Sequence, residues 1–237
     1  MRDRRLGILG GTFDPIHCGH LDLASAAASS LNLDRVIVIP SHMPPHRPRP
    51  QASSFHRFAM VALSVSGRHG WQASDDELQH DEPSFTVHTL ARLHARGYEP
   101  TEIYFLIGAD AFADIAIWRG YPGVLDGAHF VVVSRPRHSA EALRETLPTL
   151  AGRMVDAAHW TGAAQRTSII LIDAPTADVS STAIRARLAA GQSIDGMVDP
   201  RVRQHIEQHG LYRSSSSDAD ISVDVSTAQA GRLHGQK

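Results

Sequence analysis

The sequence predicts an α/β fold, with a doubly wound, mostly parallel sheet that helices cover on both faces. Short aliphatic or β-branched runs alternate with stretches in which apolar residues keep helical spacing. Such alternation is typical of βαβ units and a parallel sheet. A glycine pair follows the first apolar run. In folds of this class, the turn after the first strand commonly contacts the ligand. The predicted architecture is therefore Rossmann-like.

The first half of the chain supplies three strands and three helices to this prediction. Strands are expected at residues 6–9, 36–39 and 72–78, the second ended by Pro40. Helices are expected at residues 21–31, 55–62 and 87–94, and Gly97 closes the third. Residues 40–50 contain five prolines and are expected to form an exposed loop.

The second half continues the pattern. Strands are expected at residues 103–107, 130–133 and 168–172, and helices at 139–147, 182–190 and 200–208. Gly191 and Gly210 follow the last two helices as stop signals, and Pro200 stands in the first turn of the final one. We expect one domain over residues 1–212 and a disordered, serine-rich tail over residues 213–237.

Composition excludes several classes of protein. No apolar run approaches the roughly 20 residues that a membrane helix needs, and the N-terminal segment is too short in apolar residues for a signal peptide. These features predict a cytoplasmic protein that does not bind membranes. The formal net charge of −2 does not favour nucleic acid as a partner. Nothing in the composition decides whether the protein is a homo-oligomer.

Two residue types are nearly absent, and both absences exclude chemistry. Cys18 is the only cysteine, which rules out an intramolecular disulfide and any multi-cysteine metal site. Lys237 is the only lysine, so the chain cannot carry a P-loop lysine or a Schiff-base lysine. The 15 histidines are dispersed and form no H-E-x-x-H motif, so we expect no metal ligands among them.

The first motif is the string GGTFDPIHCGH at residues 10–20, between the first predicted strand and helix. Its glycines let the backbone approach a ligand, and the helix that follows offers free N–H groups at its start. His17 and His20 flank Gly19 and can donate hydrogen bonds to phosphate oxygens, more strongly when protonated. The glycine spacing differs from the G-x-G-x-x-G motif of dinucleotide-binding proteins.

The second motif is SSTAIR at residues 180–185, at the start of a predicted helix. Ser180 or Ser181 can cap this helix. Its hydroxyls, its free N–H groups and Arg185 can then converge on an anion.

Both motifs resemble those of the bacterial nicotinate-nucleotide adenylyltransferases, which belong to the nucleotidyltransferase superfamily with H-x-G-H and S-S-T-x-I-R motifs. Further matches are Pro44-Pro45-His46-Arg47, Ser84 to Leu90, Gly108-Ala109-Asp110, Arg135-Pro136 and Val198 to Tyr212. The resemblance is spread over roughly residues 6–212, and residues 140–167 match nothing specific. Three residues depart from the family pattern: Arg47 replaces lysine, Phe85 replaces tyrosine, and Arg119 stands where a second aromatic often follows Trp118.

The resemblance implies transfer of AMP from ATP to nicotinate mononucleotide, which gives nicotinate adenine dinucleotide and pyrophosphate in NAD biosynthesis. It implies Mg²⁺ held mainly by the ATP phosphates, without a metal site made by the protein. The catalytic residues it implies are His17, His20 and Arg185. The ATP-binding residues it implies are Gly10, Gly11, Thr12, Phe13, His17, Gly19, His20, Gly108, Asp110, Arg135, Ser180, Ser181, Thr182 and Arg185. The residues it implies for the nicotinate nucleotide are Asp14, His46, Arg47, Arg57, Thr86, Trp118 and Arg119.

Two alternatives stay open on the sequence alone. Another H-x-G-H transferase, such as a phosphopantetheine adenylyltransferase, would share both motifs but use a different phosphorylated acceptor. A non-catalytic nucleotide sensor would keep the fold and bind ATP without turnover. The intact histidines, Asp110 and Arg185 favour an enzyme.

Overall fold

A computed structural model describes residues 5–43, 48–162 and 165–213 of the chain. Seven strands form one sheet in the order β3-β2-β1-β4-β5-β7-β6, and all neighbouring strands are parallel. From β1 the chain adds β2 and β3 on one side, and then crosses to add β4 and the later strands on the other. The β1–β4 pair is therefore the topological switch point of the sheet. The predicted doubly wound α/β class is confirmed.

The strands are short and mostly aliphatic. They are β1 (Leu6–Gly11), β2 (Arg35–Pro40), β3 (Trp71–Ala73), β4 (Ile103–Gly108), β5 (His129–Val133), β6 (Met154–Asp156) and β7 (Ile169–Ile172). Every residue of β4, β5 and β7 is buried. Strands covered on both faces have no solvent-facing side, so these three are apolar runs without alternation, apart from His129 at the start of β5.

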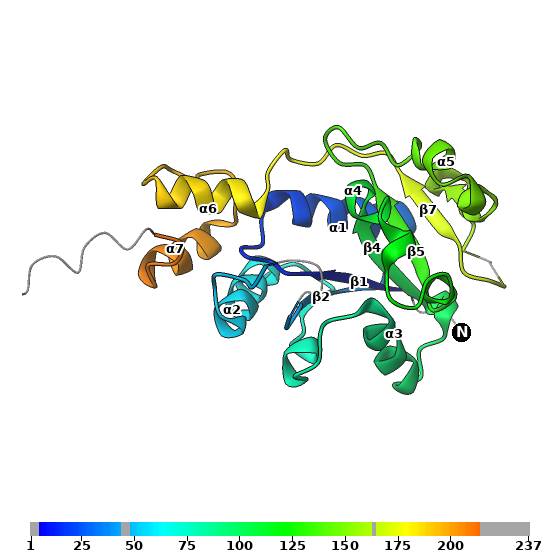
Figure 1. Ribbon diagram of the computed structural model, residues 1–237, viewed down its shortest axis with the longest axis horizontal. Helices are drawn as coiled ribbons and strands as arrows, with labels where there is room; N and C mark the ends of the chain where they lie inside the picture. Colours follow the sequence, from blue (N-terminus) through cyan, green and yellow to red (C-terminus); the bar gives the residue numbers. More distant parts are fainter. Residues whose placement is uncertain (1–4, 44–47, 163–164, 214–237) are drawn as a thin grey trace, which may run out of the picture.

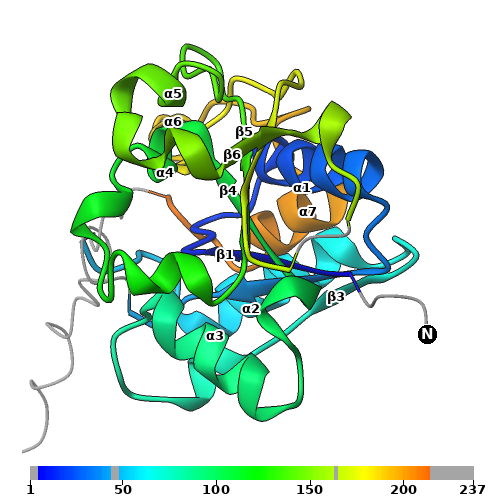
Figure 2. The same ribbon diagram turned by 90° about the vertical axis from the view of Figure 1, so that its right-hand side faces the viewer.

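The α-helices cover the two faces of the sheet, as Figures 1 and 2 show for α1 and α3. They are α1 (Cys18–Leu31), α2 (Ser54–Val65), α3 (Thr86–Ala95), α4 (Ala109–Phe112), α5 (Leu143–Thr146), α6 (Ser181–Ala189) and α7 (Pro200–Gln208). Buried residues of α1, α2, α6 and α7 share one apolar core, and those of α3, α4 and α5 share the other. Alternate residues of the central strands contribute to the two cores, as the period of a strand requires.

Short 3-10 helices connect these elements. They are η1 (Asp76–Gln79), η2 (Pro100–Glu102), η3 (Ile115–Ile117), η4 (Gly123–Asp126), η5 (Pro148–Arg153) and η6 (Ala157–His159). The sequence pattern predicted neither these turns nor strand β6, which lies inside the stretch that matched nothing specific.

Two predicted elements are wrong over most of their length. The expected strand at residues 72–78 is a strand only at Trp71–Ala73 and then becomes η1. Acidic side chains of η1 turn toward α3, where Arg92 and Thr89 bind them, and this contact ends the strand. The expected helix at 139–147 is reduced to Leu143–Thr146. The Ser134 hydroxyl accepts the backbone N–H of Ala140 at 3.0 Å, which holds that part of the chain in a turn.

The remaining predicted strands and helices are confirmed to within a few residues at each end, and the final helix, Pro200–Gln208, has the predicted bounds. The expected tail falls outside the described residues except for Arg213. Within the described ranges, no helix is long and apolar enough to cross a membrane.

Candidate active site

The first motif lies at the carboxyl end of β1, at the switch point of the sheet. β1 ends in Gly10 and Gly11, and the turn that follows leads into α1, for which His17 is the N-cap residue. A Cβ atom on Gly11 would lie 2.8 Å from the Phe13 ring, so the ring fills the space that a side chain would need. Phe13 is buried, and its edge meets the His20 ring at a centroid distance of 5.0 Å.

The two histidines of this motif stack on one another, with ring centroids 3.7 Å apart. The backbone N–H of His17 donates to Nδ1 of His20 at 3.3 Å. A neutral imidazole that accepts at Nδ1 carries its proton on Nε2. His20 is therefore set up to donate a hydrogen bond from Nε2.

His17 is buried, and its chemistry differs from the expectation that protonation would strengthen its bond to phosphate. Burial, together with the nearby charge of Arg135, lowers the pKa of His17 to about 3. His17 is therefore uncharged at pH 7. Its Nδ1 atom is buried and has no hydrogen-bond partner in the described structure. A buried polar atom without a protein partner is a candidate contact for a ligand.

Gly19 lies where the backbone and a guanidinium group come very close. A Cβ atom there would lie 2.6 Å from Nη1 of Arg135 and 2.9 Å from the carbonyl oxygen of Ala177. Arg135 donates to the carbonyl oxygens of Gly19, at 2.9 Å, and Val179, at 3.2 Å. This arginine thus ties the start of α1 to the segment that enters α6, and only glycine fits between them.

The second motif meets the first at the start of α6 (Figure 1). The Ser181 hydroxyl donates to the carbonyl oxygen of Pro15 at 2.9 Å, and Arg185 donates to that of Asp14 at 2.8 Å. Arg185 also approaches the hydroxyl of Thr182 at 3.3 Å. Ser180 is the N-cap, and its side chain accepts the N–H of Ala183 at 3.1 Å. Two motifs about 160 positions apart therefore face each other, with a helix beginning at each.

Asp14 is buried, and protein donors occupy its carboxylate. The N–H groups of Gln51 and Ala52 donate to its two oxygens at 2.8 and 3.0 Å, and the Tyr212 hydroxyl donates to one of them at 2.8 Å. Burial and the neighbouring carboxylate raise the pKa of Tyr212, which keeps its hydroxyl a donor. Asp14 thus joins the first motif to the C-terminal end of the described chain.

Arg57 is 2% exposed and also serves the surrounding backbone. Its Nη1 atom donates to the carbonyl oxygens of Thr12, at 2.8 Å, and Ser41, at 2.6 Å, while Nη2 reaches that of His42 at 3.3 Å. Its Nε atom is buried without a hydrogen-bond partner. Arg57 holds the turn after β1 against the loop after β2, which is a positioning role.

Gly108 and Asp110 stand at the end of β4, the neighbour of β1 across the switch point. A Cβ atom on Gly108 would lie 2.5 Å from Oδ1 of Asp110, so the glycine leaves room for the carboxylate. Asp110 is exposed in the first turn of α4. The structure therefore presents this carboxylate to solvent at the same edge of the sheet as the first motif.

Of the predicted contacts for the second nucleotide, Thr86 and Arg119 lie at the start of α3, whereas Asp14 and Arg57 do not. Thr86 is the first residue of α3, and Phe85 is its N-cap. Arg119 is exposed and stacks over the Phe85 ring, 4.6 Å from its centroid. Trp118 is half-buried and meets Phe105 edge-on at 6.3 Å. His46 and Arg47 lie outside the described residues, and so does the rest of their PPHR motif.

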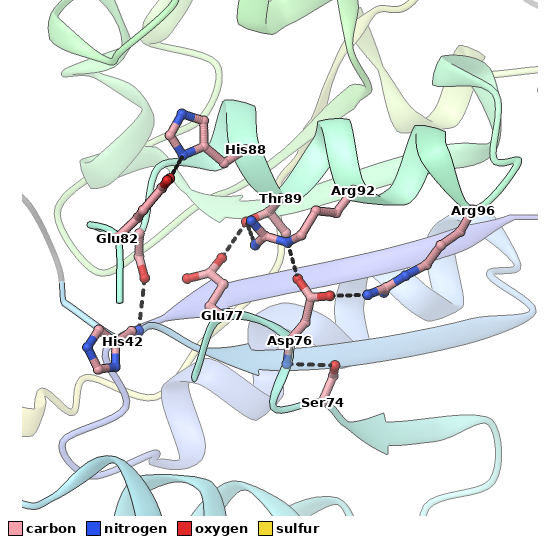
Figure 3. Close-up of polar contacts among 10 residues, drawn as sticks. His42, Ser74, Asp76, Glu77, Glu82, His88, Thr89, Arg92 and Arg96 are labelled. Carbon is pink, nitrogen blue, oxygen red and sulfur yellow. Dashed lines mark hydrogen bonds and ion pairs between the residues drawn. The ribbon is translucent and has the colours of Figure 1, made fainter. Parts of the chain in front are cut away.

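A polar cluster that the sequence did not predict joins α3 to η1 (Figure 3). The hydroxyl of Thr89 donates to Glu77 at 2.6 Å, and Arg92 donates to Asp76 at 2.6 Å. Arg96 binds the same Asp76 carboxylate. Burial raises the pKa of Glu77, although hydrogen bonds oppose the shift. The sequence indicated this cluster only by two acidic residues after a weak strand, and such residues are equally typical of a solvent-exposed turn.

Comparisons with known proteins bear on the family and the fold of the chain. Residues 8–187 match the cytidylyltransferase-like family. A probable nicotinate-nucleotide adenylyltransferase of Desulfatibacillum aliphaticivorans is 38% identical over 88% of this chain and 99% of its own. One from Cronobacter sakazakii is 39% identical over 86% of this chain and 94% of its own. A nicotinic acid mononucleotide adenylyltransferase of Plasmodium falciparum, solved with NaAD, has a TM-score of 0.65 at 21% identity and covers 88% of this chain and 97% of its own.

The fold and the paired motifs define a nucleotidyltransferase of the cytidylyltransferase-like class. Within that class, the chain belongs to the nicotinate-nucleotide adenylyltransferase family. The structural likeness at 21% identity supports the fold.

Proposed function

We propose that this protein transfers the adenylyl group of ATP to nicotinate mononucleotide, forming nicotinate adenine dinucleotide and pyrophosphate. One observation carries the proposal. The H-x-G-H turn and the start of α6 meet through Ser181 and Arg185 at the switch point of the sheet. This is where open α/β sheets bind nucleotides. The family membership of nearly the whole chain supports nicotinate mononucleotide as the acceptor.

In the reaction, an oxygen of the acceptor's 5′-phosphate attacks the α-phosphorus of ATP. The bond from that phosphorus to the bridging oxygen breaks, and pyrophosphate leaves with the electron pair. A phosphate monoester has a second pKa near ~6, so it is mostly dianionic at pH 7 and needs no general base. The task of the protein is to position two anions and to stabilise the charge that shifts to the leaving group.

The residues of the two motifs supply this stabilisation in the proposed mechanism. His20 donates from Nε2 to a phosphate oxygen, because its Nδ1 already accepts the N–H of His17. Arg185 contributes a fixed positive charge from α6. The N-termini of α1 and α6 add the positive ends of their helix dipoles. His17 acts as a neutral hydrogen-bonding group, since its pKa is about 3.

The remaining predicted residues divide into contact and positioning roles. In this proposal Asp110 binds the ATP ribose, while Trp118 and Arg119 contact the nicotinate nucleotide together with Thr86. The positioning residues bind backbone groups near the site and fix their positions; they are Asp14, Arg57 and Arg135.

Mg²⁺ enters this proposal as part of the ATP substrate. In the portion of the chain that the structure describes, no group of three or more histidine, cysteine or acidic ligands includes a residue of the two motifs. The donors there are histidines, an arginine and helix N-termini, which suit phosphate oxygens rather than a hard cation. The phosphates of ATP and water would therefore hold the ion, and its charge would offset that of the triphosphate.

A turnover assay tests the function. The protein is incubated with ATP and Mg²⁺ and with nicotinate mononucleotide, nicotinamide mononucleotide or phosphopantetheine in turn, and pyrophosphate release is followed. We expect turnover with nicotinate mononucleotide and a product with the mass of nicotinate adenine dinucleotide. Turnover with phosphopantetheine alone would assign the chain to a different acceptor. ATP binding without pyrophosphate release under any acceptor would identify a nucleotide sensor.

A further inference from the structure

Three histidines from two helices meet at a place that includes no residue of the two motifs. His56 lies in the first turn of α2, His205 in the last turn of α7, and His209 caps α7. One ring nitrogen of each lies within 4.8 Å of those of the other two. We call these residues the histidine cluster. The sequence does not indicate the histidine cluster, because 149 positions separate His56 from His205.

The arrangement has the spacing of metal ligands. His205 and His209 are four positions apart, which puts them on one face of α7, as in helical zinc sites with two histidines. Nδ1 of His56 lies 3.1 Å from Nε2 of His205. Zinc binds imidazole nitrogen at about 2.0–2.1 Å, so two ligands of one tetrahedral ion lie about 3.3 Å apart. The observed separation therefore fits two ligands of a single ion with little movement.

A hydrogen bond between two neutral imidazoles would also explain a short distance between His56 and His205. It does not account for the third ring. The His209 ring centroid lies 4.8 Å from that of His56 and 4.4 Å from that of His205. His209 is exposed and the other two are half-buried, which gives an ion a path to the site and room for a water ligand.

We propose that His56, His205 and His209 bind one borderline divalent metal ion of the Zn²⁺ class, with water as the fourth ligand. Imidazole suits zinc, copper and nickel, whereas Mg²⁺ prefers oxygen ligands and would not compete for this site. The site is thus chemically separate from the Mg²⁺ that accompanies ATP.

The proposed ion would cross-link α2 to α7, which lie side by side in Figure 1. The neighbour of His56 is Arg57, which holds the backbone of the first motif. Three residues after His209 comes Tyr212, which donates to Asp14 of that motif. A metal bound only by the folded chain stabilises it by mass action. Metal binding would therefore stabilise the packing that supports the nucleotide site.

The test is a zinc titration of the full chain, made without a histidine tag and freed of metal by a chelator. Zn²⁺ is added with Mg²⁺ present, and binding is followed by competition with a chromophoric chelator. The variants are His56→Ala, His205→Ala and His209→Ala. His159→Ala is the matched control, since the His159 side chain is 78% exposed and lies outside the histidine cluster.

We expect one tight equivalent of zinc in the natural chain and in the control. Loss of a residue that only orients a metal ligand typically weakens binding 10–100-fold, so loss of a ligand itself should cost at least about 100-fold. Zinc should raise the Tm of the natural chain and the control, and not that of the three variants. His209→Ala, at an exposed position, keeps the test valid if a variant at a half-buried position fails to fold.

Zinc affinity that is the same in the three variants as in the control would overturn the proposal. So would a natural chain that binds no tight equivalent. Neither result would bear on adenylyl transfer, because the readout is metal binding and none of the three histidines belongs to the proposed catalytic set.

Discussion

Replacing His20 with alanine is expected to lower kcat by at least about 100-fold, because one preorganised donor to the developing charge is worth about 3 kcal/mol. The structure gives the physical reason. Nδ1 of His20 accepts the backbone N–H of His17 at 3.3 Å, which fixes the ring and leaves the proton on Nε2. The change should be measured as kcat for pyrophosphate release at saturating ATP and nicotinate mononucleotide.

A second substitution separates catalysis from helix capping. Alanine also removes the acceptor for the N–H of His17, which can cost about 1 kcal/mol at the start of α1. In His20→Asn, the amide oxygen can still accept that N–H, but no donor remains at the position of Nε2. We expect His20→Asn to lose activity as His20→Ala does, with a Tm close to that of the natural chain. An alanine variant with near-normal kcat would remove His20 from the mechanism.

The largest loss of stability is expected for Asp14→Ala, at about 3–5 kcal/mol in the free energy of unfolding. Asp14 accepts three hydrogen bonds, from two backbone N–H groups and the Tyr212 hydroxyl. Removing it leaves these donors unsatisfied and leaves the buried Arg57 without the carboxylate that offsets its charge. Urea denaturation measures the change.

Two companion variants make that prediction specific. Asp178→Ala removes an exposed carboxylate that lies 3.6 Å from Arg137, and we expect a change of no more than about 0.5 kcal/mol. Tyr212→Phe keeps the ring and loses one bond to a charged acceptor, with an expected cost of about 1.5–3 kcal/mol. If Asp14→Ala were as mild as Asp178→Ala, the buried carboxylate would not organise this region.

The fold could be predicted from the sequence where local pattern and tertiary burial agree. The runs at β4 and β7, and β5 after His129, are apolar because both faces of the sheet are covered, and such a run is visible in the sequence. The helix predicted to begin at residue 139 does not form over residues 139–142, because the Ser134 hydroxyl, which lies outside this segment, binds the N–H of Ala140. Local periodicity carries no information about such a contact.

The residues of the site also differ in whether local sequence could predict them. Contiguous strings indicated the two motifs, and their facing positions follow from the parallel sheet. The supporting contacts join distant positions through single side chains, as Tyr212 does with Asp14 and Thr89 with Glu77. The histidine cluster is the extreme case, since its members belong to two helices with an unrelated local pattern. Residue type and spacing cannot predict contacts of this kind before the packing is known.

In the proposed function, the turn after β1 and the start of α6 together bind the triphosphate of ATP. The most direct measurement is a crystal structure of the protein with a nonhydrolysable ATP analogue. We expect the phosphates between the ring of His20 and the guanidinium of Arg185, with the ribose beside Asp110. An analogue bound away from both His17 and Arg185 would contradict it.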